Sequence, residues 1–208
     1  MAEELVFYTN PMSRGRIARW MLEEVGAPYR TELLGFGPSM KGTAYKALNP
    51  MGKVPTVVHR GAVVTECAAI CAYLADAFPE KNLAPPVDDR ADYYRWMFFA
   101  AGPLEAAISN RALGFEVPSD KEGMIGYGSF GLVMDALEAA LADKEYIAAG
   151  RFTAADVYVG SHVGWGLQFG SIEKRPAFVA YHGRLKERPA FRRATALDDA
   201  AMGAVPKA

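Results

Sequence analysis

The chain has 208 residues, of which 51% are hydrophobic and 23% are charged, as is typical of a folded globular protein rather than a disordered one. The formal net charge of -1 gives no general attraction to nucleic acid or to an anionic membrane, and we expect neither as a partner. No run of about 18 apolar residues without charges is present, so we expect no membrane span.

The first eight residues run from an acidic start into a strand pattern. A secretory signal would need a basic start followed by an apolar core, so we expect none. The two cysteines, Cys67 and Cys71, lie four residues apart in a helical pattern. A disulfide framework needs more cysteines at other spacings. We therefore expect a reduced, cytoplasmic protein.

The first part of the chain alternates between strand and helix patterns. A β-prone run over residues 5–8 ends at Asn10–Ser13, and the apolar residues that follow share one helical face until Gly26 ends the helix. Arg60–Gly61 between two β-prone runs predicts a hairpin turn. The expected elements are a strand at 5–8, a helix from 14, a strand at 29–34, a weak helix at 43–48, strands at 54–58 and 62–65, and a helix from 66 to 78. This order predicts a small α/β layer with helices packed on a sheet.

The pattern changes after residue 78. Residues 78–86 are polar and punctuated by proline, as linkers are, and no convincing strand follows them. Helices are expected over residues 90–113, 122–141 and 176–188. We therefore predict a domain of residues 1–80, a linker of residues 81–89 and an all-helical domain of residues 90–208.

Thr153 and Asp156 predict the start of a further helix. The threonine hydroxyl would accept from a backbone N–H, and the acid three residues later would reach back to the chain before the helix, as in a capping box. Phe152 and Val157 flank this pair and are spaced to form a hydrophobic staple.

Three segments of the chain resemble the glutathione transferase superfamily. Phe7–Arg14 is similar to its first strand, turn and helix start, Asn49–Pro55 to its proline-containing loop, and Glu66–Leu74 to a later helix start, with Cys67 where serine is usual. The predicted cap at Thr153–Asp156 also matches. The resemblance covers nearly the whole chain. It implies an N-terminal thioredoxin-like βαβ(α)ββα domain that binds glutathione, an all-helical C-terminal domain, a bacterial-type cytosolic enzyme with a serine-type active site, and no metal.

Ser13 is the first candidate for activating the thiol of glutathione. It would lie just before a helix N-terminus, where the helix dipole and the unpaired N–H groups favour an anion. A thiol with a pKa of about 8.5 is only a few per cent ionised near pH 7, so a hydroxyl donor would stabilise the thiolate. The alternative is that Ser13 only caps the helix. Tyr8, at the end of the strand, competes with it as the activator, and Asn10 is a weaker candidate with an adequate role in the turn.

The resemblance also implies the residues that bind glutathione. Val54–Pro55 is expected to contain a cis peptide bond, with the backbone of Val54 turned toward the ligand. Lys53 and Lys41 are candidates for the glycyl carboxylate, although an exposed lysine is more often only solvated. Glu66 would pair with the ligand's ammonium group, while the N–H groups at Cys67 would hold its γ-glutamyl carboxylate. An S–H is a weaker donor than an O–H.

The helical domain carries a dense aromatic cluster between Arg90 and Phe115. We expect a few of its members to face the first domain and to line a cleft for a hydrophobic co-substrate, with Phe115 as a pocket residue. Asn110 and Arg111 would steer a polar group of that substrate. The alternative is that the aromatic residues are interior packing and the two polar residues are solvated.

The activity implied by the resemblance is attack of activated glutathione, as co-substrate, on a hydrophobic electrophile. The alternatives are a glutathione-dependent reductase, peroxidase or isomerase of the same fold, or a binding protein without activity. The helix at 66–78 and the helix starting near Arg90 resemble the dimer surfaces of the superfamily. We therefore expect a homodimer.

Overall fold

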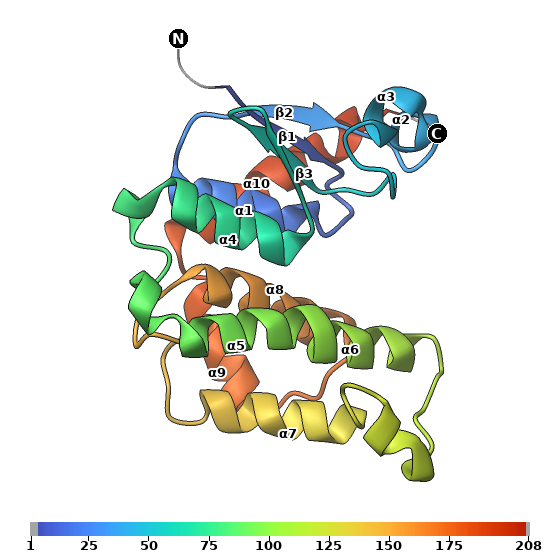
Figure 1. Cartoon of the computed structure of the whole chain (residues 1–208), viewed down its shortest axis with the longest axis vertical. Coiled ribbons are helices and arrows are strands. Elements are labelled where there is room, and N and C mark those ends of the chain that lie inside the picture. Colours follow the sequence, from blue (N-terminus) through green and yellow to red (C-terminus); the bar gives the residue numbers. More distant parts are fainter. Residues whose placement is uncertain (1–3, 207–208) are drawn as a thin grey trace. The chain divides into compact units, whose positions relative to one another are not determined.

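The structure is a computed structural model, and it describes residues 4–206. These residues form two compact units (Figure 1). One comprises the chain up to Lys81 together with the segment from Arg188 onward, and the other comprises Asn82–Glu187. The acidic start at residues 1–3 lies outside the described part, so the absence of an export signal stays a prediction.

The first unit contains a four-stranded mixed sheet. Its strands are β1 (Leu5–Thr9), β2 (Arg30–Leu33), β3 (Thr56–His59) and β4 (Ala62–Thr65). They lie in the order β2-β1-β3-β4, with β2 parallel to β1 and β3 antiparallel to both of its neighbours. Arg60 and Gly61 have φ angles of 54° and 78°, which suits the tight hairpin turn expected there. The predicted α/β layer is confirmed.

The same unit contains several helices. They are α1 (Gly15–Val25), α2 (Pro38–Lys41), α3 (Thr43–Lys46), α4 (Cys67–Ala77) and α10 (Pro189–Ala201), with 3-10 turns at Pro79–Lys81 and Met202–Ala204. Helices α1 and α4 lie side by side on one face of the sheet (Figure 1). Phe7, Ile17, Val57 and Leu74 are almost completely buried in the core of this unit. The sequence patterns did not predict α2 or α10.

Helix α10 packs against α1 through a row of ion pairs, although the two are far apart in sequence. The pair between Arg19 and Asp198 is buried, with 3.1 Å between the guanidinium and the carboxylate. The other pairs are Arg16–Asp199, Glu23–Arg193 and Glu24–Arg188, and the rings of Trp20 and Phe191 meet edge to face. The sequence-based division grouped residues 188–201 with the helical domain, whereas the contacts group them with the sheet.

The second unit consists of helices. They are α5 (Ala91–Phe99), a π-helical turn (Ala100–Leu104), α6 (Glu105–Ala112), α7 (Phe130–Leu141), α8 (Ala154–Phe169) and α9 (Pro176–Leu185), with 3-10 turns at Val87–Asp89 and Ser119–Met124. The helix expected from residue 122 begins only at Phe130, because Gly128 takes a φ of 66° and Ser129 caps the helix. Within residues 4–206, no helix combines the length and apolarity that a membrane crossing requires.

The capping box at the start of α8 is confirmed. The Thr153 N–H donates to the Asp156 carboxylate at 2.9 Å, and the Ala155 N–H donates to the Thr153 hydroxyl at 3.3 Å. The buried Asp156 carboxylate also accepts from the Ile147 N–H at 2.8 Å and from the Tyr181 hydroxyl at 2.9 Å. Burial nevertheless raises the pKa of Asp156 to about 6. The staple between residues 152 and 157 stays a prediction.

Candidate active site

Three chain segments converge at one edge of the sheet. Tyr8 is paired with Thr56, and Thr56 with Thr65. The end of β1, the start of β3 and the end of β4 are therefore neighbours. The turn after β1, the loop before β3 and the start of α4 consequently meet at this edge, as the resemblance implied.

A direct contact joins two of these segments. Cys67, the first residue of α4, is 7% exposed, and its thiol donates to the Arg14 carbonyl at 3.5 Å. The N-termini of α1 and α4 therefore lie beside each other. Cys71, one turn further on, is fully buried, and burial raises the pKa of its thiol. Cys71 is thus the core residue that its helical position indicates.

The turn between β1 and α1 is held by Asn10. Its buried side chain donates to the Leu34 carbonyl at 2.7 Å and accepts from the Met12 N–H at 2.9 Å. Both ends of the amide are therefore occupied within the protein. This favours the turn-making role for Asn10 over a role at the thiol.

Ser13 is half-buried immediately before α1. Its hydroxyl donates to the Asn10 carbonyl at 2.6 Å and accepts from the Gly15 N–H at 2.9 Å. The first turn of α1 contains no acidic residue, and its N-cap position is occupied by Arg14, whose side chain makes no cap bond. The positive end of the α1 dipole therefore has Ser13 as its nearest hydroxyl. To reach a ligand sulfur, the Ser13 proton must turn away from Asn10.

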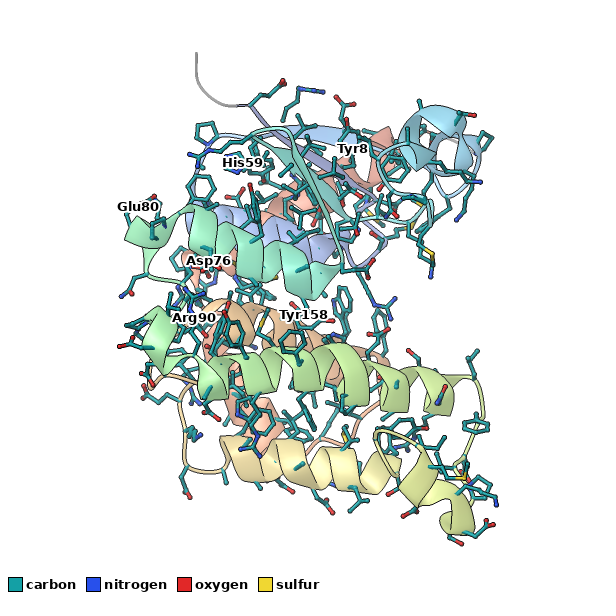
Figure 2. The ribbon with its side chains drawn as sticks, in the orientation of Figure 1. Tyr8, His59, Asp76, Glu80, Arg90 and Tyr158 are labelled. Carbon is teal, nitrogen blue, oxygen red and sulfur yellow. The ribbon has the colours of Figure 1, made fainter. Side chains whose placement is uncertain are left out.

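Tyr8 lies at the same edge but on the other face of the sheet. Alternation along β1 places Phe7 against α1, where the Arg19 guanidinium lies 4.9 Å from its ring centre. Figure 2 labels Tyr8 in the sheet unit. Its ring centre lies 5.6 Å from that of Tyr45 in α3. Tyr8 therefore faces away from the side of the sheet on which α1 begins.

The loop before β3 contains the expected cis peptide bond, between Val54 and Pro55. Its shape is held by two donors to the Lys53 carbonyl. The Tyr45 hydroxyl donates at 2.6 Å and the Asn49 amide at 2.8 Å. Hydrogen bonds from Tyr45 in α3 and from Asn49 at the start of the loop therefore hold this loop in place.

The charged candidates differ in their surroundings. Glu66 and Lys53 are exposed at the sheet edge, and Glu66 has a φ of 65°, which side-chain-bearing residues rarely adopt. The Lys41 ammonium donates to the Gly52 carbonyl at 2.7 Å and to the Met51 carbonyl at 3.3 Å. Lys41, the last residue of α2, therefore ties that helix to the loop before β3, a role that its sequence position did not reveal.

Comparison with known proteins relates this arrangement to one family. A family model described as the N-terminal domain of glutathione S-transferase matches residues 12–77. The chain is 28% identical to glutathione S-transferase GstA of Escherichia coli O157:H7 over 152 residues, which cover 71% of this chain and 75% of that protein. It is 29% identical to glutathione S-transferase 1 of Schizosaccharomyces pombe over 212 residues, which cover 86% and 91% of the two chains.

A solved structure extends this likeness over the fold. A sphingomonad glutathione S-transferase complexed with glutathione superposes with a TM-score of 0.75 at 26% identity, covering 93% of this chain and 98% of that one. The chain belongs to the glutathione S-transferase superfamily. Its N-terminal unit has the thioredoxin-like arrangement of that superfamily, and its second unit is the helical domain.

The three residues that the sequence analysis predicted for the co-substrate pocket, Phe115, Asn110 and Arg111, lie together at the end of α6. Phe115 is 49% exposed, and its N–H donates to the Asn110 carbonyl at 2.9 Å. The Asn110 amide donates to the Tyr127 hydroxyl at 3.0 Å, and the Arg111 guanidinium lies 4.1 Å from the centre of the Phe130 ring. Phe115 is therefore not a core residue, and Asn110 and Arg111 have local partners in addition to solvent.

The aromatic cluster that precedes them is divided between core and surface. Tyr93 and Trp96 are buried, whereas Tyr94 and Phe98 are 42% and 70% exposed. Interior packing, the alternative given for this cluster, therefore describes only part of it. In residues 4–206, no group of three or more His, Cys, Asp or Glu side chains is arranged to hold a metal ion.

One residue at the site was not singled out from the sequence. Thr9, the last residue of β1, is fully buried, and its hydroxyl has no hydrogen-bond partner among residues 4–206. Only the strand alternation, which places Thr9 on the same face as Phe7, hinted that it faces α1.

Proposed function

We propose that this protein is a glutathione transferase that binds glutathione at the edge of its sheet and activates the thiol for attack on a hydrophobic electrophile. The observation that carries the proposal is the meeting of the Ser13 turn, the cis Val54–Pro55 loop and the start of α4 at one edge. The relative whose structure contains glutathione supports glutathione as the ligand.

In this proposal each part of glutathione has its own partners. The N–H groups at the start of α4 receive the γ-glutamyl carboxylate, because no side chain within residues 4–206 caps that helix end. Glu66 pairs with the ammonium group beside it, and the backbone of Val54 binds the cysteinyl part. Lys53 and Lys41 compensate the charge of the glycyl carboxylate.

Ser13 is the proposed thiol activator. Its hydroxyl donates to the sulfur after turning away from Asn10, and the positive end of α1 favours the thiolate. The Asn10 carbonyl keeps a donor in this state, because the Ser13 N–H also donates to it at 3.0 Å. Tyr8 is the weaker candidate because its ring packs against Tyr45 on the other face of the sheet.

The co-substrate is proposed to be an apolar or aromatic electrophile contacted by Phe115, with Asn110 and Arg111 directing a polar group. Because Phe115 is half-exposed, Phe115→Ala should change the melting temperature little and raise the Michaelis constant for aromatic co-substrates. Kinetics that are unchanged with several such co-substrates would remove Phe115 from the site. A cytoplasmic homodimer of the superfamily type remains part of the proposal, with light scattering as its test.

The deciding experiment compares Ser13→Ala with Ser129→Ala. Ser129 also lies at a helix start, where it caps α7 in the other unit, so its loss controls for the removal of a capping hydroxyl. Ser13→Ala should still be retained on glutathione-agarose but should lose about 10²–10³-fold in turnover of an aryl halide, the usual effect of removing one donor to a developing anion. The apparent pKa of the bound thiol, followed by thiolate absorbance, should rise.

A second candidate is a glutathione-binding protein without transferase activity. It is favoured by the Ser13 hydroxyl, which already has a donor and an acceptor within the protein. Retention on glutathione-agarose without turnover of aryl halides or peroxides would support this reading. Turnover of peroxides or disulfides, but not of aryl halides, would instead indicate a glutathione-dependent peroxidase or reductase.

A further inference from the structure

The hydroxyl of Thr9 is anomalous for a buried polar group. The residue is 0% exposed, and its Oγ1 atom has no hydrogen-bond partner within the described chain. Buried side-chain hydroxyls nearly always have one, so an unpartnered one calls for an explanation. Its position is specific, because Thr9 ends β1 and precedes the turn that carries Ser13.

The location of this hydroxyl is defined by Gly15, the first residue of α1. A β-carbon at Gly15 would lie 1.9 Å from the Thr9 Oγ1 atom and 3.0 Å from the Ser13 Oγ atom. Both hydroxyls therefore border the same small space at the start of the helix. Any residue other than glycine would fill that space and displace the threonine.

The bonding of Ser13 explains why an unused hydroxyl next to it matters. In this structure Ser13 donates to the Asn10 carbonyl and accepts one hydrogen bond, from the Gly15 N–H. A hydroxyl oxygen can accept two. A second acceptor position on Ser13 is therefore open, and the unused donor of Thr9 lies across the space at Gly15.

We propose that Thr9 is a positioning residue for thiol activation. When the Ser13 hydroxyl turns to donate to the sulfur of glutathione, the Thr9 hydroxyl donates to the Ser13 oxygen. This chain of donors polarises the Ser13 hydroxyl and strengthens its bond to the thiolate, since hydrogen bonds in series reinforce one another. Thr9 itself stays buried and does not touch the ligand. The inference rests on the proposed function of Ser13.

The competing explanation is that the Thr9 hydroxyl is a packing defect with no role. The two explanations differ in one result expected for Thr9→Val, which keeps the shape of the side chain and removes the hydroxyl. Removing an unsatisfied buried hydroxyl should preserve or raise the melting temperature in either case. Only a positioning role also changes the chemistry at the sulfur.

The experiment measures melting temperature, apparent pKa of the bound glutathione thiol and steady-state kinetics for Thr9→Val and Thr9→Ser. We expect Thr9→Val to melt at or above the wild-type temperature, to raise the thiol pKa by about half a unit, and to lower kcat about 3-fold at a pH below the thiol pKa. The Michaelis constant for glutathione should change little. Thr9→Ser, which keeps a hydroxyl, should retain the wild-type thiol pKa and kcat. Wild-type thiol pKa and kcat in Thr9→Val would overturn the inference, as would equal impairment in both variants.

Ser13→Ala separates this inference from the proposed function. If Ser13→Ala leaves the thiol pKa unchanged, the proposed activation by Ser13 fails, and Thr9 loses its role with it. If Ser13→Ala raises the thiol pKa but Thr9→Val does not, only the inference about Thr9 fails. In the double variant, Thr9→Val should add no further loss, because Thr9 acts through Ser13.

Discussion

The N-termini of α8 and α4 differ in whether side chains of the protein cap the helix. At α8, the Ala154 N–H donates to the Leu83 carbonyl at 2.8 Å and the Ala155 N–H donates to the Thr153 hydroxyl at 3.3 Å. The buried Asp156 carboxylate accepts from the Thr153 and Ile147 N–H groups just before the helix. At α4, no side chain of the described residues caps the helix, and Glu66 before it is exposed. Helix α1 lies between these extremes, because the Gly15 N–H donates to a side chain, the Ser13 hydroxyl, at 2.9 Å. A helix end that the protein caps with its own side chains is structural, whereas one without a side-chain cap can receive an anionic ligand.

The largest loss of stability is expected from a substitution at the start of α8. Asp156→Ala removes the acceptor of the Ile147 and Thr153 N–H groups and of the Tyr181 hydroxyl, all of which are buried. We expect a loss of roughly 3–5 kcal/mol in the free energy of unfolding, because buried donors without acceptors are strongly destabilising. Urea unfolding measures it, with the exposed Asp143→Ala as control. A loss as small as that of the control would show that the cap at α8 is dispensable.

The titration of the Asp156 carboxylate should have a somewhat smaller effect on the free energy of unfolding. The unfolded chain loses the Asp156 proton near pH 3.8, but the folded chain holds it until about pH 6. The folded state therefore binds more protons in this window, and stability decreases as pH rises through it. The difference corresponds to about 3 kcal/mol. Asp156→Asn lacks this titration, so the stability advantage of the wild type should narrow between pH 4 and pH 6. Parallel stability curves for the two proteins would contradict the assignment.

A substitution at the start of α4 should change the binding of glutathione rather than the stability of the protein. Glu66→Ala removes an exposed carboxylate, so the melting temperature should change little. Affinity for glutathione should fall about 10-fold or more, as expected for a charge-assisted hydrogen bond. The rate at saturating glutathione should be nearly unchanged, because the interaction is remote from the sulfur. Calorimetric titration with glutathione measures the affinity. A variant that unfolds more readily but binds normally would assign Glu66 to the fold instead.

Of these substitutions, Cys67→Ser should have the smallest effect on stability and on glutathione affinity. The thiol donates to the Arg14 carbonyl across the two helix starts, and a hydroxyl is a better donor. We expect a change of less than about 1 kcal/mol in stability, with glutathione affinity equal to or higher than that of the wild type. Cys71→Ser is the informative contrast, because it places a hydroxyl in a fully buried position. A Cys67→Ser variant with much weaker binding would show that the sulfur itself is needed.

The sequence alone determined the features that depend on residues close together along the chain. The end of β1 at the Asn10–Ser13 turn, the hairpin at Arg60–Gly61 and the capping box of α8 all depend on short-range chemistry. The cis bond before Pro55 came from the resemblance, since its base rate is too low to predict it from the residues. These features follow from backbone preferences and hydrogen bonds that span only a few residues.

Other features were decided only by the tertiary structure. The pair Arg19–Asp198 joins residues 179 positions apart, so no local pattern could assign α10 to the sheet unit. The half-exposure of Phe115 depends on what packs around the end of α6. The unused hydroxyl of Thr9 depends on how closely the start of α1 approaches the end of β1 at Gly15. Burial and long-range pairing arise only when distant segments meet, because apolar periodicity indicates which face turns inward but not which partner that face will meet.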